Sequence, residues 1–267
     1  MKNKTLSITP FCRRRAWCIG LSVAFLLLTS CHTPYQMGEV SRTRILIDKR
    51  YDATLPAEAL SFLAPYRHQV DSIMSPQVGT AARYLFADRP EGPLSNLLPD
   101  ILMWASKSFN ENPDLAVYNV GGMRAALAEG KVTVSDVVDV APFENKICFL
   151  TLTGQKLTEL FQQIAHRGGE GVSHGVVMQI TPDGKLLSVQ VNGKDIDVQA
   201  RYRIVTIDYL SQGNDEMTAF QSATDIVSPQ DAQNNVRNYI MDYFREKMRQ
   251  GQSVDCAVEG RITVVNP

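Results

Sequence analysis

Residues 115–145 contain the side chains in this chain that are best suited to chemistry. A short apolar run at 115–118 predicts a strand, and the paired glycines Gly121 and Gly122 follow it. Because glycine has no Cβ, the backbone can bend sharply there and a ligand can approach it closely. Arg124, which we expect at the start of a brief helical turn, adds a planar and permanently charged group that suits phosphate or carboxylate. Alone, such a segment is more often a structural turn between a strand and a helix than a site.

A second stretch strengthens the case for a site. The sequence TIDYLSQGND at 206–215 is a β-rich run that ends in an aromatic residue, a glycine and an aspartate. Taken together, the two stretches resemble the C-terminal, substrate-binding domain of the 5′-nucleotidase family. The resemblance covers about residues 70–225 and rests on motifs in the family's order: RPEGPLSNLLPD at 89–100, NVGGMR at 119–124, APFEN around Phe143, LTG at 152–154 and DYLSQGND at 208–215.

The resemblance implies roles for six side chains in one nucleotide site. Two aromatic rings stack on the two faces of a nucleobase, an asparagine lies near the base, a carboxylate holds the ribose hydroxyls, and arginines face the phosphate. The matching residues are Phe143 and Tyr209 for the rings, Asn119 for the asparagine, Asp215 for the carboxylate, Arg124 for the phosphate and, about one residue out of register, Arg89 as a further arginine. Stacking contributes about 1–3 kcal/mol per base, and a carboxylate can accept two hydroxyl hydrogen bonds.

The loop around Asp215 departs from the family's pattern. Asn214 and Glu216 stand where the family usually has glycines, and Tyr209 replaces a phenylalanine but keeps the stacking face. Asparagine can still adopt a left-handed backbone conformation. The two glycine replacements are the main support for a third interpretation, in which the site has decayed and the domain is a scaffold.

The N-terminal residues 1–31 are typical of a targeting segment. A basic start precedes an apolar run at 16–28 and the sequence LTSC, which ends at Cys31. This pattern resembles the bacterial lipoprotein signal, in which the cysteine carries lipid. The alternative is an uncleaved membrane anchor, although the run is shorter than the ~20 residues that a membrane span needs. We therefore expect an extracytoplasmic protein that is lipid-anchored to the bacterial cell envelope, with a tether at 32–41 and a domain at 42–267.

Periodicity predicts an α+β fold: a single domain with a mixed β-sheet and packed helices. Helices are expected where apolar residues recur every three or four positions, and strands where β-rich runs lie between turn signals. The expected helices are 56–74 with a break at Pro65, 94–109, one that starts at Thr153 and stops at Gly168, and 232–248; the expected strands are 43–48, 77–86, 115–118, 146–152, 202–209 and 261–265, with hairpin turns at 183–184 and 192–193.

The charge of the chain excludes one class of partner. The net charge is −1 and no basic block lies outside the N-terminus, so a nucleic acid polymer is not an expected partner. Two cysteines, Cys148 and Cys256, remain in the domain once the signal is removed and Cys31 carries lipid. Cys148 lies in an apolar run and is expected to be a buried thiol. An extracytoplasmic location permits a disulfide between the two, and their spacing does not decide the matter.

The residues that hydrolysis requires are not evident in this sequence. The family's reaction depends on two metal ions held by His, Asp and Asn in a separate N-terminal domain. The four histidines here, at 32, 68, 166 and 174, have no acidic metal-ligand pattern around them. We therefore expect no cofactor in this chain and two divalent metals on a partner phosphatase, which together would form a split 5′-nucleotidase acting on a nucleoside monophosphate. The alternative is a non-catalytic lipoprotein that captures nucleosides or nucleotides for uptake.

Overall fold

The computed structural model describes Gly38, residues 43–44 and residues 56–266. The segment Ala57–Pro267 forms one compact unit. The predicted signal with Cys31, most of the tether and most of the strand expected at 43–48 lie outside the described residues, so these remain predictions. Within the described part, no helix is long and apolar enough to cross a membrane.

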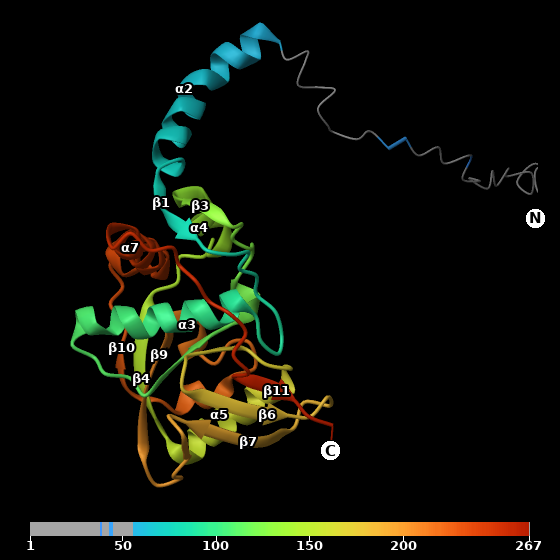
Figure 1. The fold of residues 1–267 in the computed structure, drawn as a ribbon, viewed down its shortest axis with the longest axis vertical. Helices are drawn as coiled ribbons and strands as arrows, with labels where there is room; N and C mark the ends of the chain where they lie inside the picture. The colour runs from blue at the N-terminus through green and yellow to red at the C-terminus, as the bar shows by residue number, and fades with distance from the viewer. Residues whose placement is uncertain (1–37, 39–42, 45–55, 267) are drawn as a thin grey trace, which may run out of the picture. The chain divides into compact units, whose positions relative to one another are not determined.

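A five-stranded mixed sheet forms the centre of this unit (Figure 1). Its order is β10 (Thr224–Val227), β4 (Ile147–Thr153), β9 (Arg201–Ile207), β2 (Leu115–Tyr118) and β5 (Gly171–Val172). Only the β2–β9 pair is parallel. Every residue of β2 and all but the last residue of β4 are buried. Both faces of the sheet centre are therefore covered, which explains the continuous apolar runs.

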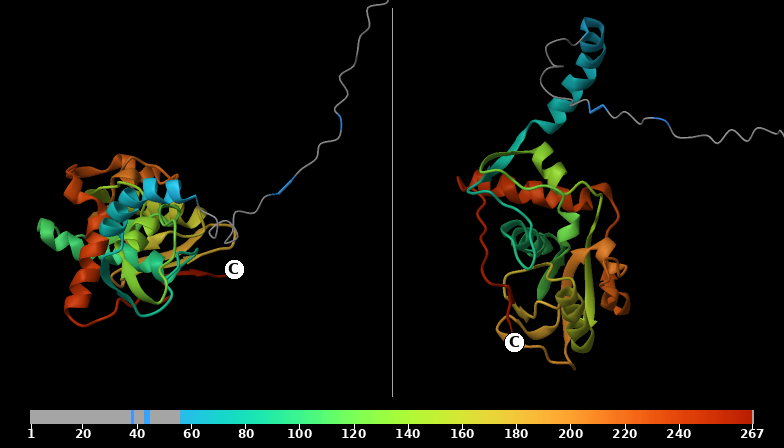
Figure 2. Two further views of the ribbon diagram at one scale, coloured as in Figure 1. Left: turned by 90° about the horizontal axis from the view of Figure 1, so that it is seen from above. Right: turned by 90° about the vertical axis from the view of Figure 1, so that its right-hand side faces the viewer.

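Two helices pack against this sheet, and a third packs against one of them and against β1 (Gln77–Ala81) (Figure 2). Helix α3 (Pro93–Ala105) lies against β2, β5 and α7 (Val236–Arg249), while α5 (Gly154–His166) lies against β4 and β9. The predicted cap of α5 is confirmed, because the Thr153 side chain accepts a hydrogen bond from the Lys156 amide at 3.3 Å. Pro93 occupies the first turn of α3, where its missing N–H costs nothing.

Two smaller sheets complete the fold. One has the order β11 (Ile262–Val264), β6 (Val176–Ile180), β7 (Leu186–Val191) and β8 (Lys194–Asp195). Both predicted hairpin turns are confirmed; the tight turn between β7 and β8 has positive φ at Asn192 (51°) and Gly193 (73°), as a two-residue hairpin loop requires. The other sheet pairs β1 (Gln77–Ala81) with β3 (Gly130–Thr133), and α4 (Val134–Val140) follows β3. The α+β class with mixed sheets is thus confirmed.

The structure corrects several predicted boundaries. The strand expected at 77–86 ends at Ala81, where its pairing with β3 also ends, opposite Gly130. The helix expected at 94–109 ends as a 3-10 turn at 106–109. The helix expected at 232–248 is a 3-10 turn at Ala232–Asn234 followed by α7. β3 and α4 were not predicted, although Thr133 and Asp136 form a capping box there.

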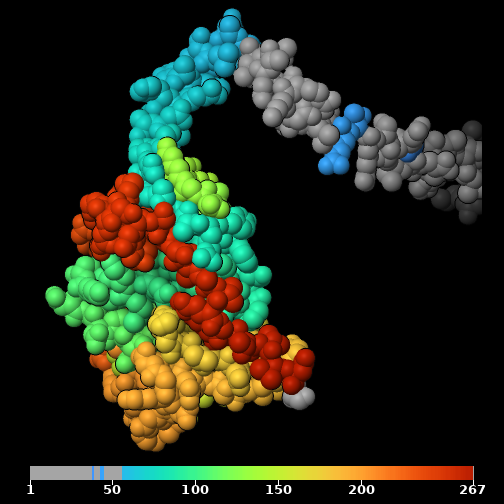
Figure 3. Space-filling view, viewed as in Figure 1, coloured from blue at the N-terminus to red at the C-terminus, as the bar shows by residue number. Residues whose placement is uncertain are grey.

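Helix α2 (Ala57–Met74) runs through Pro65, where a break was expected. Proline fixes φ at a helical value and removes one N–H, and the surrounding turns remain helical. No residue of α2 is buried. Its exposed apolar side chains are Leu60, Phe62, Leu63, Tyr66, Val70 and Ile73. The helix is the blue-to-cyan segment of the space-filling view (Figure 3).

Candidate functional site

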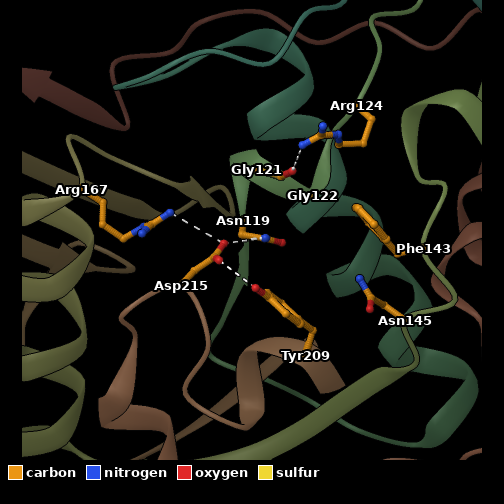
Figure 4. A pocket seen from close by; sticks show the side chains of 9 residues that line it. All are labelled: Asn119, Gly121, Gly122, Arg124, Phe143, Asn145, Arg167, Tyr209 and Asp215. Carbon is orange, nitrogen blue, oxygen red and sulfur yellow. Dashed lines mark hydrogen bonds and ion pairs between the residues drawn. The ribbon is translucent and has the colours of Figure 1, made fainter. Parts of the chain in front are cut away.

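A cavity of about 420 Å³ lies where loops from four parts of the chain meet (Figure 4). The contributing segments are the turn after β2, the loop before β4, the end of α5, and the segment that follows β9. Five of the six predicted site residues line it, together with Asn145, Arg167 and the glycine pair; the lining residues are Asn119, Gly121, Gly122, Arg124, Phe143, Asn145, Arg167, Tyr209 and Asp215. The tertiary structure thus brings together residues that are almost 100 positions apart.

The two predicted stacking rings are both exposed. Phe143 is 50% exposed and Tyr209 is 38% exposed. The loop that carries Phe143 is held by Arg237 of α7, which donates to the carbonyls of Ala141 (2.9 Å) and Pro142 (2.7 Å). Tyr209 lies in the short helix α6 (Asp208–Ser211), not at the end of the strand as expected. Two such rings, held by a rigid scaffold and open to the cavity, can receive a planar aromatic ligand.

Asp215 is the acceptor at the centre of the cavity wall. Its carboxylate accepts hydrogen bonds from the Tyr209 hydroxyl (2.9 Å) and the Asn119 amide (2.7 Å), and Arg167 Nη2 lies 3.7 Å from it (Figure 4). The hydrogen bond to Asp215 raises the pKa of Tyr209 above its ordinary value of 10.0. Since a carboxylate has about four lone-pair sites, Asp215 can still accept hydroxyl groups of a ligand.

The backbone around Asp215 adopts a conformation that favours glycine. Asp215 has φ of 54° and Glu216 has φ of 61°, both in the left-handed region, which costs L-residues about 1–2 kcal/mol each. Glu216 therefore occupies a strained position, at a place where the family usually has glycine. Asn214 lies outside this region, and its side chain donates to the Tyr209 carbonyl at 2.7 Å.

Asn119 is held deep in the cavity wall. It is 4% exposed, and within the described part of the chain its Oδ1 has no hydrogen-bond partner. A Cβ at position 122 would lie 2.6 Å from this oxygen, so the close approach requires Gly122. A buried acceptor without a partner is costly, and a ligand N–H donor would satisfy it.

Arg124 supplies an unpaired positive charge at one side of the cavity. Its backbone amide donates to the Val140 carbonyl at 2.9 Å, and its guanidinium makes only a long contact, 3.3 Å, to the Gly121 carbonyl. No carboxylate lies within 4 Å of it among residues 56–266. Arg124 follows a 3-10 turn at Val120–Gly122 and does not begin the helical turn expected there. An anionic group in the cavity would find this guanidinium available.

Arg89, the sixth predicted residue, is not among those that line the cavity. Its guanidinium donates to the Gly169 carbonyl at 2.8 Å and to Glu170. The second arginine of the cavity is instead Arg167, which sequence reasoning missed. Arg167 lies just beyond α5, at the C-cap, and the only signal in the sequence was a basic residue beside the glycine pair Gly168–Gly169.

The cavity walls offer binding groups and no set of metal ligands. Across residues 56–266, no group of three or more His, Cys, Asp or Glu side chains could hold a metal ion. Cys148 is a buried free thiol and Cys256 is a half-buried free thiol, so the structure contains no disulfide between them. The arrangement can bind a flat ring, hydroxyl groups and an anion at the same time.

Comparison with known proteins identifies what this arrangement is similar to. Residues 77–222 match the family model described as 5′-nucleotidase, C-terminal domain. The chain is 23% identical to the protein UshA of Escherichia coli (strain K12) over 161 residues, which is 59% of this chain and 29% of that protein. It is 26% identical to the 5′-nucleotidase of Vibrio vulnificus over 182 residues, 67% of this chain and 32% of that protein.

Solved structures agree with these relatives. A 5′-nucleotidase precursor from Thermus thermophilus superposes with a TM-score of 0.66 at 25% identity, covering 79% of this chain and 43% of that chain. This chain spans about a third of the length of the two curated relatives named above. Because the family model matches more than half of the 267 residues, this chain belongs to the 5′-nucleotidase C-terminal domain family.

Proposed function

We propose that this chain recognises a nucleoside monophosphate and presents it to a metal-dependent phosphatase on a separate chain. The observation that carries the proposal is the grouping of Phe143, Tyr209, Asp215 and Arg124 around one cavity. Two rings suit a base, a carboxylate suits ribose hydroxyls, and an unpaired guanidinium suits phosphate. The family's substrate-binding domain supports the same role.

The separate phosphatase chain is proposed from the extent of the similarity. The curated relatives named nucleotidases are about three times as long as the part that this chain matches. The described residues supply side chains for recognition, and the two divalent metals that activate water in such reactions are assigned to the partner. Lipid attachment at Cys31 would place this chain on the extracytoplasmic face of the cell envelope.

Calorimetric titration of the full chain in detergent, with a chelator present, tests the recognition site. We expect AMP to bind more tightly than adenosine, because only AMP engages Arg124. The Arg124→Ala variant should lose about tenfold in AMP affinity and little in adenosine affinity. The matched control is Arg245→Ala, which removes an exposed arginine on α7 and should change neither affinity. Equal losses for AMP and adenosine in Arg124→Ala would contradict the phosphate role.

A second measurement tests the division between two chains. The purified chain, mixed with AMP and Mn²⁺ or Zn²⁺, should release no inorganic phosphate. Phosphate release that disappears in a Phe143→Ala, Tyr209→Ala double variant would show that this chain is itself the phosphatase. Tight adenosine binding with no preference for AMP would favour the alternative function, capture of nucleosides by a binding lipoprotein.

A further inference from the structure

Glu170 is a buried carboxylate that lies behind the wall of the cavity and outside its lining. The residue is 1% exposed. One carboxylate oxygen accepts from Arg167 Nε at 2.7 Å and from the Arg89 guanidinium. The other oxygen accepts from the Val120 amide at 2.5 Å. A buried carboxylate is tolerated only when it is paired and fully hydrogen-bonded, so these contacts hold Glu170 in one position.

The glycine pair before Glu170 makes this arrangement possible. Gly168 and Gly169 both have positive φ, 78° and 110°. A Cβ at position 169 would lie 2.6 Å from the Pro90 carbonyl, so only glycine lets the two backbones approach this closely. The approach brings Arg89 against Glu170, and Arg89 also donates to the Gly169 carbonyl at 2.8 Å.

Two lines of contact lead from Glu170 to opposite sides of the cavity. Through Arg167 it reaches Asp215, since Arg167 Nη2 lies 3.7 Å from that carboxylate. Through the Val120 amide it holds the 3-10 turn Val120–Gly122, and the Gly121 carbonyl of this turn contacts Arg124 Nη1 at 3.3 Å. The residue that accepts hydroxyls and the residue that faces the anion are thus both tied to one buried carboxylate.

We infer that Glu170 is a positioning residue that sets the Asp215 side and the Arg124 side of the cavity relative to each other. This inference rests on the proposed nucleotide site. Glu170 also draws Arg167 away from Asp215. Without that negative charge, Arg167 would close the 3.7 Å gap to Asp215 and compete with ligand hydroxyls, because a charge-assisted hydrogen bond to a carboxylate is about twice as strong as a neutral one.

Hydrogen–deuterium exchange on the full chain, without any nucleotide, tests the positioning directly. The variant is Glu170→Gln, which keeps the shape and removes the charge. The matched control is Glu111→Gln, which breaks a more exposed carboxylate–guanidinium pair, that of Glu111 with Arg203; neither residue lines the cavity. In Glu170→Gln the peptide 119–124, which loses the charged acceptor of its Val120 amide, should exchange about tenfold faster, while the core strand peptide 147–153 stays unchanged. Unchanged exchange at 119–124, or equal acceleration in the control, would overturn the inference.

Titration with adenosine and 2′,3′-dideoxyadenosine then measures how the position of Asp215 affects the affinity for ribose hydroxyls. If Asp215 accepts the ribose hydroxyls, the intact chain should bind adenosine about tenfold more tightly than the dideoxy compound. In Glu170→Gln the ratio of the two affinities should fall towards one, and in Glu111→Gln it should stay about tenfold. A variant that had only lost stability would keep the preference. A preference that stays intact in Glu170→Gln would refute the inference. If the intact chain bound neither nucleoside nor AMP while exchange still rose selectively, the proposed function would fail and the positioning role would stand.

Discussion

In the proposed nucleotide complex, the hydroxyl of Tyr209 would compete with the ribose for the carboxylate of Asp215. In the free protein the hydroxyl donates to Asp215 Oδ1 at 2.9 Å, and the Asn119 amide donates to Oδ2 at 2.7 Å. Each carboxylate oxygen has two lone-pair sites, so a ribose that places both of its hydroxyls on Oδ1 would displace the tyrosine hydroxyl. The Tyr209→Phe variant keeps the stacking ring and removes this competition, so we expect it to bind adenosine more tightly than the original chain does.

The expected gain follows from the geometry. A hydrogen bond to a charged group contributes about 1.5–3 kcal/mol. Tyr209 is 38% exposed, and water replaces part of the lost bond, which reduces the difference to about 1 kcal/mol. That corresponds to about fivefold tighter adenosine binding. For 2′,3′-dideoxyadenosine, which has no hydroxyls for Asp215, we expect no gain.

Calorimetric titration of both nucleosides against the original chain and the variant measures the effect. Tyr66→Phe, a change of the same kind on the exposed helix α2, is the control and should leave both affinities unchanged. Weaker adenosine binding by Tyr209→Phe would refute the reasoning, since it would mean that the hydroxyl orients Asp215 for the ligand. An equal gain for both nucleosides would also refute it, because the effect would then come from stacking alone.

Three further predictions concern stability. Glu216→Gly, at φ of 61°, should relieve left-handed strain and stabilise the fold by about 1 kcal/mol, which thermal unfolding would show as a rise of about 2–4 °C in Tm; a lower Tm would mean that the side chain makes a stabilising contact. Gly154→Ala places a Cβ 1.9 Å from the Asp197 carbonyl at the start of α5 and should cost about 3 kcal/mol in urea unfolding, so a loss below about 1 kcal/mol would show that the loop shifts easily. The hydrogen bond from Arg203 lowers the pKa of Glu111 from 4.5. The pair therefore stabilises the protein above pH 4.5, and this contribution is lost as the pH falls through the lowered pKa. In Glu111→Gln the free energy of unfolding should depend less on pH in that range, and an unchanged dependence would contradict the assignment.

Local sequence signals were sufficient for several elements. Asn192–Gly193 predicted a tight hairpin because both residues tolerate the positive φ that such a turn needs. Thr153 predicted the start of α5 because its hydroxyl can satisfy a free amide one turn later. In these cases the interaction lies within a few residues of chain, so the sequence alone contains the cause.

The sequence by itself also determined most of the candidate site. The order and spacing of NVGGMR, APFEN and DYLSQGND identified the family, and five of the six residues that they implied line one cavity. These motifs are informative because each places a glycine or an aromatic ring at the end of a helix or strand, and the fold holds that end in a fixed position.

Only the tertiary structure decided which arginines face the cavity. Arg89 and Arg167 are both basic residues beside turns, and nothing in the sequence distinguishes them. The distinction arises because Glu170, buried in the folded chain, attracts both guanidiniums and leaves only Arg167 within reach of Asp215. Arg89 and Glu170 are 81 positions apart. Their pairing depends on how helices and strands pack, and burial makes that pairing obligatory.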